Sequence, residues 1–175
     1  IVDPDTEKEN KHPNYIKEED IEAIVNWVKS GGVLLLMAND SANTELEKFN
    51  MLAANFGVSF NKDSKGKVIG NQFDMGKITI TRSNPIFATP KAVFIKEFSS
   101  LHLTGSAQSI LKDKDGNVVV ATVKFGKGTV LFIGDPWLYN EYVDGRKLPT
   151  EYDNFNAGDD IIHWINKHLP SSAQW

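Results

Sequence analysis

Five acidic or amide side chains follow apolar runs that have the length of buried strands. They are Asp3, Asp5, Asn39, Asp40 and Asp135. Ligands of open parallel sheets bind beyond the carboxyl ends of the strands, so residues in these positions are predicted to share one edge. Carboxylates there could bind a divalent cation, or act as an acid and base pair on a glycosidic or ester bond. Asp and Asn are also common in turns and helix caps, and that interpretation stays open for each residue.

A second group of candidates follows the last apolar run. Trp137 offers a flat aromatic face to the apolar side of a pyranose, and Asn140 and Glu141 offer hydrogen-bonding groups to its hydroxyls. Further along the chain, Asp153 and Asn154 provide more groups of the same kind. These residues predict a carbohydrate-binding site, and packing of the aromatic rings against the core is the alternative.

Other chemistries lack the residues that they need. The chain has no cysteine, which excludes disulfides, thiolate metal ligands and cysteine nucleophiles. His163 and His168 are five positions apart, whereas a helical metal pair has a spacing of four, and no Gly-x-Ser-x-Gly motif is present. We therefore predict no metal site, no cofactor and no catalytic residue for this domain by itself.

Charge and hydropathy narrow the range of partners. The net charge of -4 and the pI near 5.6 give no general attraction to phosphate backbones, so nucleic acid is not an expected partner. The apolar runs are about five residues long, whereas a membrane-spanning helix needs roughly 20. No membrane span is therefore predicted, and the oligomeric state is left open.

The elements that would position the candidate residues alternate between helix and strand. Periodic apolar residues predict a helix from about residue 16 to residue 30 and a strand over 33–37. A second helix is expected from Thr44, which has capping-box spacing, to Gly57. The predicted strand is apolar on both faces, as is typical of a central parallel strand covered by helices. This order favours an α/β fold with a doubly wound sheet.

The middle of the chain, about residues 58–123, has a different character. Short β-like runs alternate there with turn residues, including an Asp-Gly hairpin signal within 113–117, and they predict an antiparallel β-rich insertion. A strand over 129–133 and a last helix capped by Asp153-Asn154 follow. We expect a single domain over 1–170 that is truncated at its N-terminus, with a short tail after it.

The order of these elements resembles that of a known family. Its most specific pieces are Gly134-Asp135-Pro136 followed by Asn140-Glu141, and Asp153-Asn154 at the start of the last helix. The chain resembles the non-catalytic class I glutamine amidotransferase-like domains that are appended to bacterial unsaturated rhamnogalacturonyl hydrolases. The resemblance implies a flavodoxin-like three-layer parallel sheet, an extracytoplasmic location, periplasmic or secreted, and a role in the use of pectin or other glycans. Glutaminase activity is excluded because it needs a cysteine nucleophile.

Together these observations predict a non-catalytic accessory module of a glycan-degrading protein. Such a module would bind carbohydrate, or would organise an assembly with a catalytic domain of the same polypeptide. A hydrolase that uses Asp135 with Glu141 or Asp40 is one alternative, and it would need two carboxyl groups about 5 to 10 Å apart. A purely structural interaction domain is the other alternative.

Overall fold

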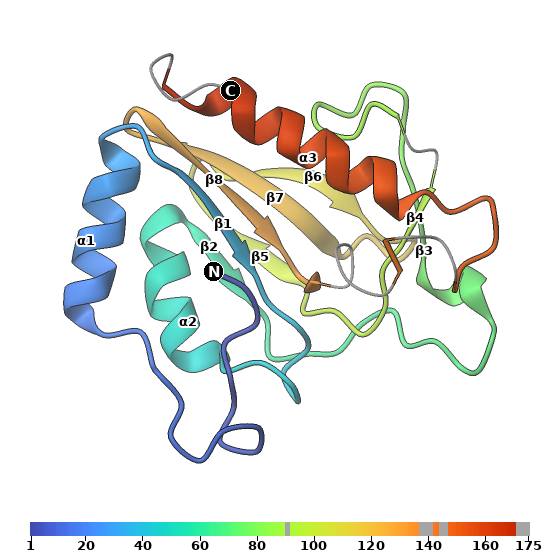
Figure 1. The fold of residues 1–175 in the computed structure, drawn as a ribbon, viewed down its shortest axis with the longest axis horizontal. Coiled ribbons are helices and arrows are strands. Elements are labelled where there is room, and N and C mark those ends of the chain that lie inside the picture. Colours follow the sequence, from blue (N-terminus) through green and yellow to red (C-terminus); the bar gives the residue numbers. More distant parts are fainter. Residues whose placement is uncertain (90–91, 137–141, 144–146, 171–175) are drawn as a thin grey trace.

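The computed structural model describes residues 1–89, 92–136, 142–143 and 147–170 (Figure 1). Its elements, in chain order, are α1 (Glu18–Lys29), β1 (Val33–Met37), α2 (Leu46–Ala53), the short 3-10 helix η1 (Ala54–Phe56), β2 (Val58–Phe60), a second 3-10 helix η2 (Phe73–Gly76), β3 (Lys77–Thr79), β4 (Ala92–Phe94), β5 (Leu101–Leu103), β6 (Gln108–Lys112), β7 (Val118–Phe125), β8 (Gly128–Ile133) and α3 (Asn154–His168).

The main sheet has four strands in the order β1-β8-β7-β6. β1 and β8 are parallel, with Val33 opposite Thr129, whereas β8 with β7 and β7 with β6 are antiparallel. Two small antiparallel sheets, β2-β5 and β3-β4, complete the strand pairing within the described residues. The main sheet is therefore mixed.

The prediction of a flavodoxin-like parallel sheet with an antiparallel insertion over 58–123 is wrong. Strand β6 and most of β7 lie within that segment, yet they are two of the four strands of the main sheet. The error has a physical reason, because a continuous apolar run marks a strand that is covered on both faces, whatever the direction of its neighbours. β8 is buried along its whole length although β7 beside it is antiparallel.

Helices cover both faces of the main sheet. One hydrophobic cluster joins α1 and α2 to one face, and it includes Phe49, Leu36 and Phe132. The other cluster joins Ile161 and Trp164 of α3 to the opposite face. Figure 1 shows α1 and α2 on one side of the strands and α3 running across the other side. Side chains alternate between the two faces along each strand, so both clusters draw on the same strands.

Several predicted elements are confirmed because local sequence determines them. α1, β1 and β8 lie where periodicity and apolar runs predicted them, and Asp153 is the N-cap of α3. The helical segment α2-η1 ends at Gly57, whose φ of 77° lies in the left-handed region that favours glycine. The N-cap of α2 is Glu45 and not the predicted Thr44, which frees the Thr44 hydroxyl for another contact.

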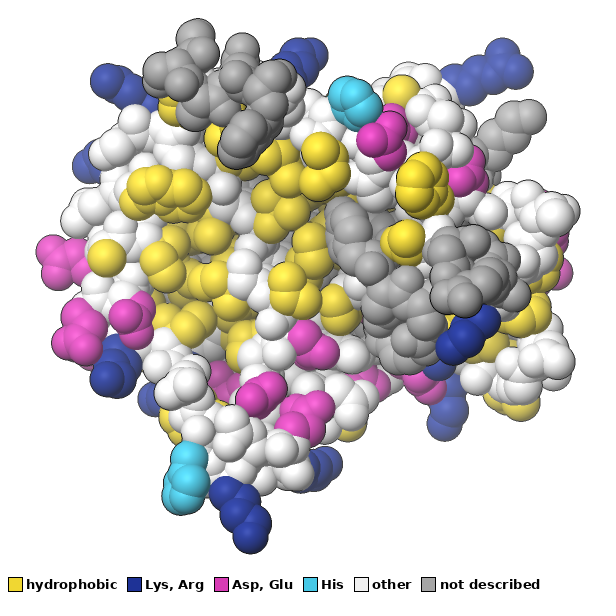
Figure 2. All heavy atoms as spheres, in the orientation of Figure 1, with side chains coloured by type: hydrophobic (Ala, Val, Ile, Leu, Met, Phe, Trp, Pro, Cys, Tyr) yellow, Lys and Arg dark blue, Asp and Glu magenta, His cyan; other side chains and the backbone are white. Residues whose placement is uncertain are grey.

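β1 forms one edge of the main sheet. The N-terminal residues extend this edge by a parallel bridge between Val2 and Met37, and the Ile1 amino group donates to the Leu35 carbonyl. Ile1 and Val2 are themselves exposed. Figure 2 shows hydrophobic side chains gathered between α1 and α3 around this edge, with Asp and Glu side chains beside them at the carboxyl end of β1.

None of the helices in the described part of the chain combines the length and the hydropathy needed to cross a bilayer.

Candidate functional site

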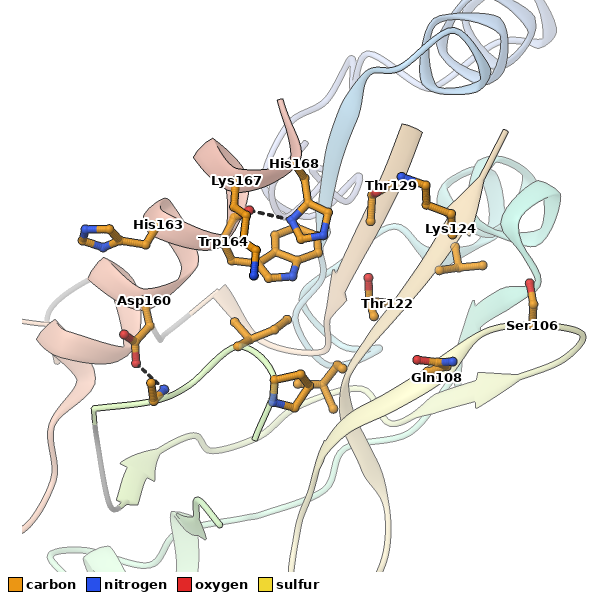
Figure 3. Close-up of a pocket in the computed structure, with 15 residues that line it drawn as sticks. Ser106, Gln108, Thr122, Lys124, Thr129, Asp160, His163, Trp164, Lys167 and His168 are labelled. Carbon is orange, nitrogen blue, oxygen red and sulfur yellow. Dashed lines mark hydrogen bonds between the residues drawn. The ribbon is translucent and has the colours of Figure 1, made fainter. Parts of the chain in front are cut away.

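A cavity of about 650 Å³ lies between the C-terminal half of α3 and the main sheet, within the size range of small-molecule sites, which is roughly 300–1,000 Å³ (Figure 3). We call it the α3 groove. Its lining comes from α3, from β6, β7 and β8, and from the segment before β4. The lining residues are Pro85, Ile86, Ala88, Ser106, Gln108, Ile110, Thr122, Val123, Lys124, Thr129, Asp160, His163, Trp164, Lys167 and His168.

The sheet side of the α3 groove carries a row of polar side chains. Gln108 of β6 pairs with Thr122 of β7, and Lys124 of β7 pairs with Thr129 of β8. Because side chains two positions apart on a strand share a face, Thr122 and Lys124 lie on the same face of β7. Three neighbouring strands therefore present hydroxyl, amide and ammonium groups to one cavity.

Thr129 is a buried residue of this row whose hydroxyl has unused hydrogen-bonding capacity. It is 4% exposed, and its Oγ1 has no hydrogen-bond partner within the described residues. The Thr122 hydroxyl, by contrast, donates to the Val130 carbonyl at 2.9 Å. A buried polar group without a partner costs roughly 1–3 kcal/mol. The Thr129 hydroxyl is therefore a group that a bound ligand could satisfy.

The helix side of the α3 groove carries two neighbouring rings that are tilted by 34°. The rings of Trp164 and His168 lie 4.4 Å apart between centroids, and in Figure 3 they face Thr122 and Thr129 across the groove. His168 Nδ1 is 2.7 Å from the Trp164 carbonyl oxygen. Since a carbonyl only accepts, Nδ1 is the nitrogen that donates in this contact. His168 Nε2 is then left for another partner.

Fixed contacts hold the third wall of the α3 groove. The Asp160 carboxylate accepts hydrogen bonds from the Ala88 and Thr89 amides, at 2.8 and 3.0 Å, and from the Thr89 hydroxyl at 3.1 Å. Asn84 ties the same segment to β6 by donating to the Ile110 carbonyl at 2.9 Å. The wall is therefore attached to α3 at one end and to the sheet at the other, which gives the groove its shape without a ligand.

The predicted residues at the carboxyl ends of β1 and β8 also come together. We call Asp3, Asn39, Asp40, Thr44 and Asp135 the acidic edge. The Thr44 hydroxyl donates to Asp3 Oδ1 at 2.5 Å and accepts from the Asn39 amide at 2.6 Å. Ser99 links the two strand ends, because its hydroxyl donates to the Asn39 carbonyl and its amide donates to the Gly134 carbonyl.

The carboxylates of the acidic edge are bonded within the fold. Asp40 accepts from the Ala42 amide and from the Asn43 side chain. Asp135 is completely buried, and its Oδ2 accepts from the Lys96 amide at 3.2 Å. Burial raises the pKa of Asp3, and the hydrogen bonds from Thr44 and Asn39 oppose that rise. These contacts match the turn and packing interpretation of the same residues.

The other predicted residues lie elsewhere. Asp5 accepts from the Asn10 side chain. Asp153 caps α3 by accepting from the Asn156 amide, and Asn154 bonds both the amide and the carbonyl of Phe94 in β4, at 2.8 and 2.9 Å. Asp153 and Asn154 thus join α3 to the small β3-β4 sheet.

Three further predicted residues, Trp137, Asn140 and Glu141, are outside the described residues, so the carboxylate pair of Asp135 with Glu141 stays a prediction. Within the described ranges, no group of three His, Asp or Glu side chains is arranged to hold a metal ion.

Weak signals for the α3 groove are present in the sequence. Thr129 is the one polar residue of the run 129–133, and Trp164 and His168 are four positions apart on one helix face. Neither signal is specific, because a threonine in a strand and an aromatic pair on a helix lack the distinctive spacing of metal-binding or nucleophile motifs.

Solved structures with the same fold come from proteins of several kinds. The mmIFT52 N-terminal domain has a TM-score of 0.67 at 14% identity, and the match covers 86% of this chain and 72% of that one. The cytoplasmic protein STM1381 from Salmonella typhimurium LT2 has a TM-score of 0.61 at 17% identity, over 86% of this chain and 62% of that one. A β-galactosidase from Rahnella sp. R3 has a TM-score of 0.57 at 15% identity, over 89% of this chain but 22% of the enzyme. At these identities the likeness shows the fold alone.

No curated protein sequence matches the chain significantly. The resemblance to glutamine amidotransferase-like domains of rhamnogalacturonyl hydrolases is wrong, because the family model that matches, over residues 10–147, is a different one. The sequence pattern does not identify that family, because strands that end in acidic turns and a capped last helix occur in many α/β proteins. The chain belongs to the family described as domain of unknown function DUF4350.

Proposed function

We propose that this domain is a non-catalytic module that binds carbohydrate in the α3 groove, as an accessory to a glycan-degrading protein. The observation that carries the proposal is the buried Thr129 hydroxyl, which has no partner within the described residues and lines a cavity of small-molecule size. Sugar hydroxyls both donate and accept, so they suit a groove that presents a hydroxyl, the Gln108 amide and the imidazole of His168.

The absence of a suitable pair of carboxylates in the groove favours binding over catalysis. Asp160 is the one carboxylate among the lining residues, and it is hydrogen-bonded to Ala88 and Thr89. Glycoside hydrolysis generally uses two carboxyl groups on either side of the scissile bond. The described carboxylates of the acidic edge are likewise bonded within the fold.

The comparison with a β-galactosidase shows the fold as one part of a longer enzyme, and the class of ligand is our proposal. The fold of this chain matches 22% of the length of that enzyme, so the same architecture occurs as one part of a protein that is named for a sugar substrate. An accessory module of this kind would hold a glycan close to a catalytic domain.

A titration of the whole chain with monosaccharides and short oligosaccharides, followed by NMR chemical shifts, tests the proposal. We expect shifts at Thr129, Gln108 and Trp164, and weaker binding in Thr129→Val. The matched control is Thr79→Val, because Thr79 is an exposed threonine of β3 outside the groove. Binding that is unchanged in Thr129→Val, or shifts confined to other surfaces, would refute the site. Release of reducing sugar from an oligosaccharide by the pure chain would refute the non-catalytic role.

A further inference from the structure

We infer that the α3 groove selects a hydroxylated ligand that carries one anionic group, a carboxylate or a phosphate. This inference rests on the proposed function, and it adds the charge of the ligand. It starts from Lys124 and Lys167, which line the groove from β7 and from α3 respectively. Neither lysine forms an ion pair within the described residues.

The balance of donors and acceptors points to an anion. Both ammonium groups and the Trp164 indole N–H can only donate, whereas the Thr129 hydroxyl, the Gln108 amide and the His168 ring can donate or accept. The Asp160 carboxylate is the charged acceptor of the lining, and it accepts three hydrogen bonds from the wall of the groove. A ligand rich in acceptors complements such a site. A carboxylate or phosphate supplies the most acceptors, and its bonds to ammonium groups are the stronger, charge-assisted kind.

The position of Lys124 strengthens this argument. Lys167 and His168 lie in the last turn of α3, where cations are favoured by the helix dipole, so their placement has a structural explanation. Lys124 is an exposed residue of β7 that lies directly opposite the buried Thr129. Lys124, Thr129 and Lys167 all line the same groove (Figure 3). This local pair of cations stands out in a chain whose net charge is -4.

Three ligands with one sugar skeleton test the inference: glucose, glucuronate and glucose 6-phosphate. Calorimetric titration of the whole chain at low salt should show glucuronate or glucose 6-phosphate binding about tenfold or more tightly than glucose, which corresponds to one charge-assisted contact. The preference should shrink as ionic strength rises, since salt screens partly exposed charges. Comparison of the two acids distinguishes a carboxylate site from a phosphate site.

Variants locate the effect. The double variant Lys124→Gln, Lys167→Gln should lose most of the preference for the acids over glucose. The matched control is Lys112→Gln, because Lys112 is an exposed lysine at the end of β6 that does not line the groove. Equal binding of glucose and both acids would overturn this inference and leave the proposed function standing. A preference for the acids that survives in the double variant would also overturn it. If none of the sugars binds, the proposed function and the inference fail together.

Discussion

The acidic edge and the α3 groove lie at opposite ends of the same strands, and both are rich in polar side chains. At the acidic edge, Thr44 joins Asp3 to Asn39, and Asp40 is bonded to its own turn. In the α3 groove, the equally buried Thr129 has no partner within the described residues, and two lysines form no ion pair there. The two regions contain similar residue types, so the difference lies in their hydrogen bonds. Polar groups that the fold leaves without partners indicate a binding site better than residue type does.

The largest effect is expected where a predicted site residue is bonded most completely within the fold. Asn154→Ala removes both partners of the Phe94 backbone, and it leaves a buried amide and carbonyl unsatisfied. Each such group costs roughly 1–3 kcal/mol, so we expect a loss of about 2–4 kcal/mol in the free energy of unfolding, measured by urea denaturation.

The control for this variant is Asn71→Ala. Asn71 is exposed, and its change should stay within about 0.5 kcal/mol. Equal stability of the two variants would show that the contacts of Asn154 are not structural, which would reopen its role as a ligand-binding residue.

A pair of identical substitutions tests the comparison directly. Thr44→Val and Thr129→Val each replace a buried hydroxyl by a methyl group of similar size. Thr44→Val leaves the Asn39 amide without its partner, so we expect a loss of about 1–3 kcal/mol in the free energy of unfolding. Thr129→Val loses no hydrogen bond within the described residues, so its free energy of unfolding should stay the same or rise by up to about 1 kcal/mol.

Ligand affinity should follow the opposite order. Thr129→Val is expected to weaken sugar binding, whereas folded Thr44→Val should bind like the original protein, which calorimetry can measure. Destabilisation of similar size in both variants would contradict the comparison, because it would mean that Thr129 takes part in the fold as Thr44 does.

Local sequence predicted those parts of the fold that depend on neighbouring residues. Helices α1 and α3 and strands β1 and β8 follow from periodicity, caps and apolar runs. The direction in which neighbouring strands pair cannot be predicted in this way. A strand such as β8, which is buried on both faces, has a continuous apolar sequence whether its neighbour is parallel or, like β7, antiparallel. A mixed sheet was therefore missed.

The candidate site was predicted only in part, for a related reason. The positions of Asp3, Asn39 and Asp40 after apolar runs predicted that they lie at one edge of the sheet, and they do. Whether their polar atoms are free depends on contacts distant in sequence, such as Ser99 with the Asn39 carbonyl, 60 residues away. The α3 groove combines residues of three strands and one helix, and no local pattern indicates that they meet.

The smallest expected effect concerns the carboxyl group of Asp3 in the acidic edge. Burial raises the pKa of Asp3 above its usual 3.8, so the folded protein keeps this proton to a higher pH than the unfolded chain does. Between the unfolded and the folded pKa, the folded state therefore binds more protons, and the contribution of Asp3 to stability falls as pH rises through that window. Asp3→Asn should remove this loss, because an amide does not ionise, still accepts from Thr44, and tolerates the φ of 44° at this position.

Urea denaturation of Asp3→Asn and of the original protein between pH 3 and pH 7 measures this effect. At pH 7 we expect the variant to be the more stable by less than about 1 kcal/mol, since Asp3 is partly exposed to solvent. The advantage should shrink as pH falls below the folded pKa and both side chains become neutral. A variant that is less stable at pH 7 would show that the bonds from Thr44 and Asn39 outweigh the burial of the charge. The ionised carboxylate of Asp3 would then stabilise the fold through its hydrogen bonds at the acidic edge.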